Sequence, residues 1–144
     1  MFFNKKKPAK AYEGPPLDPE WARNKRGKYP RLQHLDTMAE GLNGLSGVYV
    51  IWHSGVKPGW VYVGKSSNLA NTLDDMLDND EVMEFEKNGG LYVTWSPVRE
   101  ERQNGVVRFL HETMAPKVTN PAAESVKDGP VNVKLPNEQS RKPL

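Results

Sequence analysis

Residues 47–64 of this 144-residue chain read GVYVIWHSGVKPGWVYVG, and this stretch decides the expected fold. Two runs rich in valine and aromatic residues, 47–52 and 60–64, flank a loop of turn-forming residues, 53–59. β-Branched and aromatic side chains favour strands, whereas glycine and proline favour the turn between them. The stretch therefore predicts an antiparallel β-hairpin with a loop of moderate length.

The sequence that follows the hairpin alternates between helix and strand patterns. Residues 68–77 carry apolar side chains at helical spacing, with Ser66 or Ser67 as the N-cap. Residues 91–95 repeat the strand composition, and residues 99–114 form a charged, amphipathic helix pattern. We expect an α+β domain in which a small three-stranded antiparallel sheet is flanked by helices.

Two shorter helices are predicted before the hairpin. Residues 35–42 combine a capping residue, a helical apolar spacing and a closing glycine. Residues 18–23 begin with Asp18, a good N-cap, and Pro19, which the first helical position tolerates.

Composition divides the chain into three parts. The apolar fraction of 37% is below the roughly 45–50% of an average globular chain, so the core is expected to be smaller than the chain. Residues 1–34 are predicted to be a basic, partly disordered arm, residues 35–120 the folded domain, and residues 121–144 a flexible tail.

Charge is unevenly distributed along the chain. Residues 1–34 carry nine Lys or Arg against three Asp or Glu, whereas residues 46–118 carry seven against ten. Residues 46–118 are therefore mildly acidic, whereas a folded domain that binds phosphates normally carries a net positive charge. Contact with a polyanion is therefore expected from the arm.

The strands of the hairpin resemble the two-part motif of the GIY-YIG nuclease family. The first half is Gly47-Val48-Tyr49, and the second is Tyr62-Val63-Gly64-Lys65. A closing Pro116…Asn120 element is also similar to that family, with one residue extra. The resemblance covers about half of the chain, and it implies the order strand, strand, helix, strand, helix.

The resemblance also implies metal-dependent hydrolysis of phosphodiester bonds. In that family a tyrosine region activates water, an arginine on the first helix stabilises phosphate charge, and a glutamate on the second helix holds a divalent cation. Carried onto this chain, Tyr49, Tyr62 and Lys65 are present at one edge of the expected site, and Asn120 closes it.

Two positions depart from the pattern. The arginine position is Thr72, and no Lys or Arg occurs between residues 66 and 86. The glutamate position is Val107, which binds no metal. Glu112 lies five residues further, about 140° around the helix, and Glu100 or Glu101 substitutes only with a longer spacing to Pro116. The site is therefore expected to be vestigial, without a metal.

The best candidate for binding outside this site is the arm, where cations are interleaved with aromatic residues. Trp21 is expected to be exposed there. Such a pattern suits nucleic acid, an acidic protein partner or an anionic membrane surface. The candidate residues are Lys5, Lys6, Lys7, Trp21, Arg23, Lys25, Arg26, Lys28 and Arg31.

Residue usage excludes several classes of protein. The absence of cysteine excludes disulfides, thiolate zinc sites and a cysteine nucleophile. No apolar stretch approaches the roughly 18 residues of a transmembrane helix, and no hydrophobic segment follows the N-terminal charges. We expect a soluble, cytoplasmic protein.

These observations lead to one favoured function and two alternatives. We expect a catalytically degenerate GIY-YIG-like domain that acts as a binding or scaffold module for nucleic acid or a protein complex, with no cofactor. One alternative is an active Mg²⁺-dependent endonuclease that cleaves DNA with displaced residues such as Arg99, Arg102 or Glu112. The other is a nucleic-acid-binding structural protein that works mainly through residues 5–31.

Overall fold

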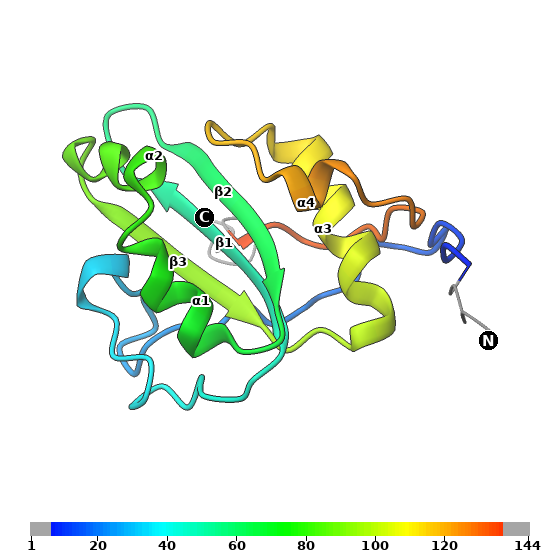
Figure 1. Ribbon diagram of the computed structural model, residues 1–144, viewed down its shortest axis with the longest axis horizontal. Coiled ribbons are helices and arrows are strands. Elements are labelled where there is room, and N and C mark those ends of the chain that lie inside the picture. The colour runs from blue at the N-terminus through cyan, green and yellow to red at the C-terminus, as the bar shows by residue number, and fades with distance from the viewer. Residues whose placement is uncertain (1–6, 137–144) are drawn as a thin grey trace, which may run out of the picture.

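The sheet is built from three antiparallel strands, as predicted. A computed structural model of the protein describes residues 7–136 and shows β1 (Gly47–His53), β2 (Gly59–Ser66) and β3 (Leu91–Ser96). The strand order is β2-β1-β3, so the hairpin places β1 in the centre (Figure 1). The α+β architecture with a three-stranded antiparallel sheet and flanking helices is confirmed.

The helices follow the hairpin and the third strand. They are α1 (Leu69–Met76), α2 (Asp80–Met83), α3 (Glu100–Met114) and α4 (Pro121–Glu124), with 3₁₀ turns η1 (Leu32–His34) and η2 (Glu84–Lys87). Asn68 caps α1 in place of Ser66 or Ser67, because its side chain accepts from the Asn71 amide while Ser66 ends β2. Within residues 7–136, no helix combines the length and apolar character of a membrane span.

The two short helices predicted before the hairpin are not formed. Residues 35–42 make turns, since a segment this short rarely supports a helix without tertiary help, and buried Leu42 folds back onto the core. Residues 18–23 are not helical either, because the Pro19 carbonyl accepts from Ser96 Oγ and the Ala22 amide donates to the Trp95 carbonyl. Bonds to β3 replace those of a helix.

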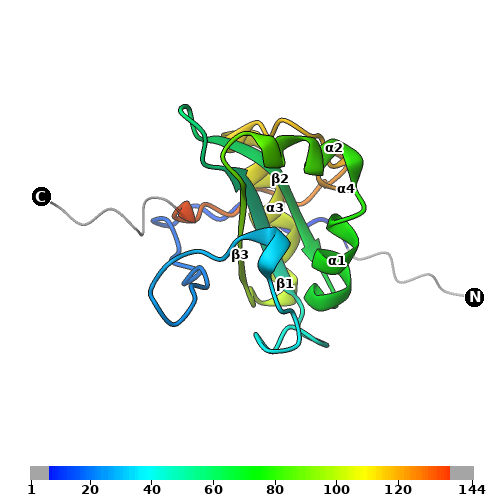
Figure 2. The ribbon, with the colours of Figure 1, turned by 90° about the vertical axis from the view of Figure 1, so that its left-hand side faces the viewer.

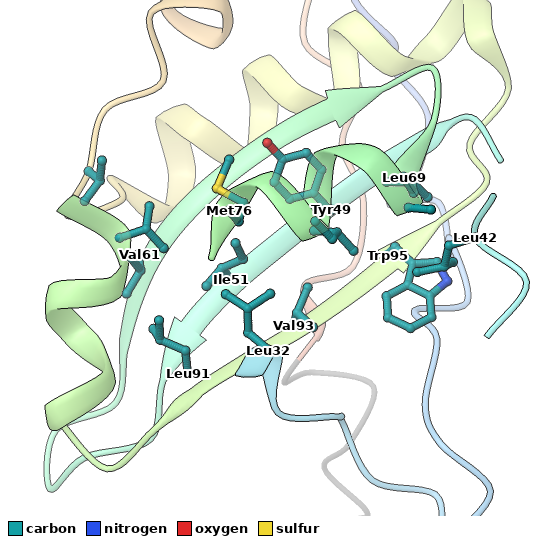
Figure 3. Packing of buried hydrophobic residues seen from close by; sticks show 14 residues of the cluster. Leu32, Leu42, Tyr49, Ile51, Val61, Leu69, Met76, Leu91, Val93 and Trp95 are labelled. Carbon is teal, nitrogen blue, oxygen red and sulfur yellow. The ribbon is translucent and has the colours of Figure 1, made fainter. Parts of the chain in front are cut away.

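The sheet is covered on both faces. Alternation along β1 directs Tyr49 and Ile51 to the face that packs against α1, which we call the α1 face (Figure 3). Val48, Val50 and Trp52 lie on the opposite side, the α3 face, where they pack with residues of α3. All seven residues of β1 are buried, so the central strand has no solvent-facing side.

Both edges of the sheet are also occupied. Beyond β3, the Val93 amide donates to the Pro30 carbonyl at 3.1 Å, and the backbones of Arg31 and Tyr92 form an antiparallel β-bridge. Beyond β2, the Val118 amide donates to the Val61 carbonyl at 2.9 Å. Exposed strand edges are sites of unwanted pairing, so these two segments close the sheet.

The described parts of the arm and tail belong to the folded unit. Much of the arm runs beside the tail and packs with it on the α3 face (Figure 2), whereas Ala22 and Leu32 pack with the cluster of the α1 face. Leu17 bridges to Val133, and the Val131 amide donates to the Gly105 carbonyl at 2.9 Å. The expected boundaries at residues 34 and 120 therefore move outward, and residues 1–6 and 137–144 lie outside the described part.

The prediction that Trp21 is exposed is wrong. Its side chain is only 3% exposed, and its indole Nε1 donates to the Lys134 carbonyl at 2.7 Å. The residue packs with Val131 and Val133 in the cluster on the α3 face. No local pattern indicates this burial, because the hydrogen-bond partner, Lys134, lies 113 residues away along the chain.

Replacing Trp21 tests whether the arm is part of the core. We expect Trp21→Ala to lower the free energy of unfolding by about 3–5 kcal/mol, as for other buried tryptophans. Urea unfolding followed by circular dichroism measures the change. Met38→Ala is the control, since Met38 is 66% exposed and its loss should change stability by less than about 0.5 kcal/mol. Equal, small effects of both substitutions would show that the arm does not pack.

Candidate functional site

The two motif tyrosines meet on the α1 face. Tyr49 pairs with Gly64 and Ile51 pairs with Tyr62, so the tyrosines are diagonal neighbours across β1 and β2. Their ring centroids are 6.2 Å apart with planes inclined by 20°. Tyr49 is buried and Tyr62 is half-buried. The hairpin register therefore brings together the two aromatic residues that the sequence singled out.

Gly64 and Asn120 complete this cluster. A Cβ atom at Gly64 would lie 2.6 Å from the Tyr49 hydroxyl and 2.9 Å from Asn120 Nδ2, so any larger residue would have to displace one of these side chains. Asn120 Nδ2 donates to the Val63 carbonyl at 3.0 Å, and its Oδ1 accepts from the Ala122 amide at 3.1 Å. Asn120 thus caps α4 and holds the edge of β2 beside Tyr49.

Thr72 has a structural contact in place of a phosphate ligand. Its Oγ1 lies 2.6 Å from Ser66 Oγ, which ties α1 to the end of β2. Nearby on α1, the Asp74 carboxylate accepts from the Thr37 hydroxyl at 3.1 Å. Neither α1 nor α2 contains Lys or Arg, so these two helices supply no positive charge to this side of the cluster.

The remaining motif residues lie on the opposite face of the sheet. Lys65 pairs with Val48, and its exposed side chain lines a cavity of about 640 Å³ with Glu100 and Asn104. Val107 is 2% exposed and packs in the cluster of the α3 face. Because successive strand residues point to opposite faces, the sheet separates Lys65 and Val107 from Tyr49 and Tyr62.

The residues proposed as displaced catalytic groups all belong to α3 or its start, and each contacts another side chain away from the two motif tyrosines. Arg99 Nε lies 3.1 Å from Glu101 Oε1, and Arg102 lies 5.9 Å from the Tyr12 ring centroid. Glu112 accepts from Arg108 Nε at 2.7 Å. None of these contacts involves Tyr49 or Tyr62.

The donor set does not fit Mg²⁺. This ion prefers an octahedral set of oxygen ligands that includes one or two carboxylates. Within the described residues, no three His, Cys, Asp or Glu side chains form a group that could hold a metal ion. The position that should supply the carboxylate is Val107, buried among apolar side chains.

Both tyrosines are held as neutral phenols. Burial raises the pKa of Tyr49 far above its ordinary value, and the nearby Tyr62 adds to this rise. Burial also raises the pKa of Tyr62, with a smaller contribution from the Glu81 carboxylate. A phenol with a raised pKa is a poor general base at neutral pH, because too little of it is ionised.

A second candidate site is the basic turn, residues 23–28. The Asn24 amide donates to the Lys28 carbonyl at 2.7 Å, and Asn24 Oδ1 accepts from the amides of Arg26 and Lys28 at 2.9 and 3.1 Å. Gly27 has φ of +73°, which favours glycine over other residues. The arm therefore presents its cations on an ordered loop.

Arg23 is fixed at the base of this turn. Its guanidinium carbon lies 4.7 Å from the Tyr29 ring centroid, and its terminal nitrogens donate to the Gly27 carbonyl at 3.2 Å and the Tyr29 hydroxyl at 3.3 Å. The Tyr29 hydroxyl donates to the Pro136 carbonyl, and its ring packs edge-on against Trp52 at 4.9 Å. Arg23 is thereby anchored to the core.

The other arm residues singled out by sequence have different roles. Trp21 is buried, and Arg31 pairs with Glu86 at 2.5 Å while lying over Tyr92. Lys7 lines the cavity that contains Lys65, and Lys5 and Lys6 lie outside the described residues.

Four cations of the basic turn stay available for a partner. None of them pairs with a carboxylate in the part of the chain that the structure describes. All four side chains belong to exposed residues: Arg23, Lys25, Arg26 and Lys28.

Comparison with protein-family models, with curated proteins and with solved structures finds no match. The geometry of the two sites is therefore the basis for assigning a function. The prediction from the sequence did not include Asn24, whose side chain orders the basic turn. An asparagine three residues before a glycine is a weak turn signal, and this pattern alone does not specify the hydrogen bonds that the Asn24 side chain makes.

Gly64 offers a test of the tyrosine cluster. We expect Gly64→Ala to lower the free energy of unfolding by about 1–3 kcal/mol, since its Cβ overlaps Tyr49 and Asn120. Tyr49→Ala opens this space, so the double variant should cost less than the sum of the two single changes. Urea unfolding of the unmodified protein, the two single variants and the double variant gives the coupling free energy between the two positions. Strict additivity would show that the two residues do not touch.

Proposed function

We propose that this protein is a non-catalytic binding module, in which the GIY-YIG-like hairpin is a scaffold and the basic turn contacts a polyanionic partner. The observation that carries the proposal is the basic turn itself. It holds four exposed cations without carboxylate partners among the described residues, on backbone ordered by Asn24. Cations fixed in place lose less entropy on binding than cations on a free chain.

The distribution of charge supports this assignment of the binding surface. The segment that contains α1 and α2 exposes acidic side chains without neighbouring cations: Asp74, Asp75, Asp78, Asp80 and Glu81. A polyanion is repelled from that side and attracted to the turn. The tyrosine cluster, which borders the acidic segment, is therefore a poor place for a phosphate chain.

Catalysis is disfavoured by the division of the motif between two faces. A nuclease site needs a nucleophile activator, a cation and a metal-binding carboxylate within reach of one phosphate. Here Tyr49 and Tyr62 share the α1 face, whereas Lys65 and Val107 belong to the α3 face. The hairpin keeps a role in folding, because β1 supplies residues to both clusters of the core.

The alternative function is that of an active Mg²⁺-dependent endonuclease, and one assay separates it from the proposal. Supercoiled plasmid incubated with the protein and Mg²⁺ should show no nicking above a protein-free control. Nicking that requires Mg²⁺ and disappears with Tyr62→Phe would establish the endonuclease and overturn the proposal, because that substitution removes only the hydroxyl of the motif tyrosine.

Neutralising the basic turn tests polyanion binding directly. We expect the triple variant Lys25→Ala, Arg26→Ala and Lys28→Ala to bind heparin on the order of tenfold to a hundredfold more weakly at low salt. The slope of log affinity against log salt concentration should fall in magnitude by about 2, because three cations no longer displace counterions. Titration of labelled heparin at several salt concentrations measures both quantities.

A matched variant controls for net charge. Lys57, Lys117 and Lys127 are exposed and lie outside the turn, so their replacement by alanine removes the same total charge. We expect this control to bind within about threefold of the unmodified protein, the scale of general charge effects. Equal losses in the two triple variants would show that the turn is not the binding surface.

A further inference from the structure

The guanidinium of Arg23 is a planar group that lies over the ring of one tyrosine. Tyr29 lies under it at 4.7 Å, and hydrogen bonds to the Gly27 carbonyl and the Tyr29 hydroxyl fix its position. Arg23 is nonetheless an exposed residue, so its side chain meets solvent. Because no carboxylate pairs with Arg23 in the described part of the chain, its guanidinium is available to a ligand.

The platform is rigid because it rests on the core. Tyr29 packs edge-on against Trp52, which is 6% exposed, and Trp52 stacks on Tyr92 at 6.1 Å. An arginine that is already fixed by contacts loses little freedom when a planar group packs on its guanidinium. Arginine planes stack with nucleobases in this way.

The cations beside the platform supply the complementary contacts. Lys25, Arg26 and Lys28 follow Arg23 within five residues, and the turn closes by the bond between the Asn24 amide and the Lys28 carbonyl. Ammonium and guanidinium groups bind phosphate oxygens. A planar stacking group next to several phosphate ligands is the combination found in single-strand nucleic-acid sites.

Two other occupants fit these observations less well. An acidic protein partner would be expected to use an apolar or aromatic anchor at the centre of its contact. Within the described residues, the exposed large apolar side chains are Met38, Val56 and Leu77, and none belongs to the turn. A duplex keeps its bases stacked on one another, which leaves the plane of Arg23 without a partner.

We propose that the basic turn binds single-stranded nucleic acid, with an unpaired base stacked on the outer face of the Arg23 guanidinium and the flanking phosphates bound by Lys25, Arg26 and Lys28. This inference rests on the proposed function and adds the class of partner. It does not involve the tyrosine cluster, so binding through the turn is independent of the hairpin motif.

The test compares strands that differ in only one property. The full-length protein is titrated with a labelled single strand of roughly 12 nucleotides, in RNA and DNA forms, and with an abasic strand of equal length and charge. We expect the strand with bases to bind about tenfold more tightly than the abasic strand, the effect of stacking one base. Arg23→Lys should abolish this preference, because lysine keeps the charge and lacks the plane.

The abasic strand also reports whether a variant keeps its turn. Arg23→Lys should bind the abasic strand within about twofold of the unmodified protein, since the number of cations is the same. Arg26→Lys is the matched control: Arg26 makes no ring contact among the described residues, and its variant should keep the preference for bases. Loss of preference in both variants would overturn the role of Arg23.

Three outcomes separate this inference from the proposed function. Equal affinity for the abasic and complete strands, or tighter binding of the matching duplex, overturns the single-strand assignment while polyanion binding stands. If polyglutamate binds as tightly as the single strand, the choice of nucleic acid is overturned in favour of an acidic protein. If the protein binds none of these polyanions, heparin included, both proposals are overturned together.

Discussion

The three-stranded sheet has two open edges, and closing them is the constraint on which the remaining structure depends. Residues 117–118 bond to the free edge of β2, while residues 22 and 30 bond to the free edge of β3. An uncovered edge would offer backbone groups to other chains, and those groups would lack partners wherever the edge is buried. Segments distant in sequence are therefore integral to the sheet, including part of a basic arm with little apolar surface of its own.

The same closure positions the two candidate sites. At the β2 edge it brings Asn120 beside Gly64 and Tyr49, in a cluster with no room for a side chain at Gly64. At the β3 edge it carries the chain past Trp21 and Tyr29 and leaves residues 23–28 as the loop between them. The basic turn is ordered because both of its ends are anchored in the core.

The alternation of a strand explains why motif residues that are close in sequence do not form one site. Tyr62 and Gly64 lie on the α1 face, and Lys65, the next residue, lies on the α3 face with Val107. Thr72 bonds to Ser66, and burial raises the pKa of each tyrosine. The cluster thus has the composition of a packing contact between β1, β2 and α1.

The sequence by itself determined the hairpin, the third strand, and the helices at α1 and α3, because these depend on local propensity and short-range periodicity. Tertiary structure decided the burial of Trp21, the loss of the short helix over residues 35–42, and the rigidity of the basic turn. Each of these depends on partners far along the chain, such as Lys134 for Trp21, and no local pattern specifies such contacts.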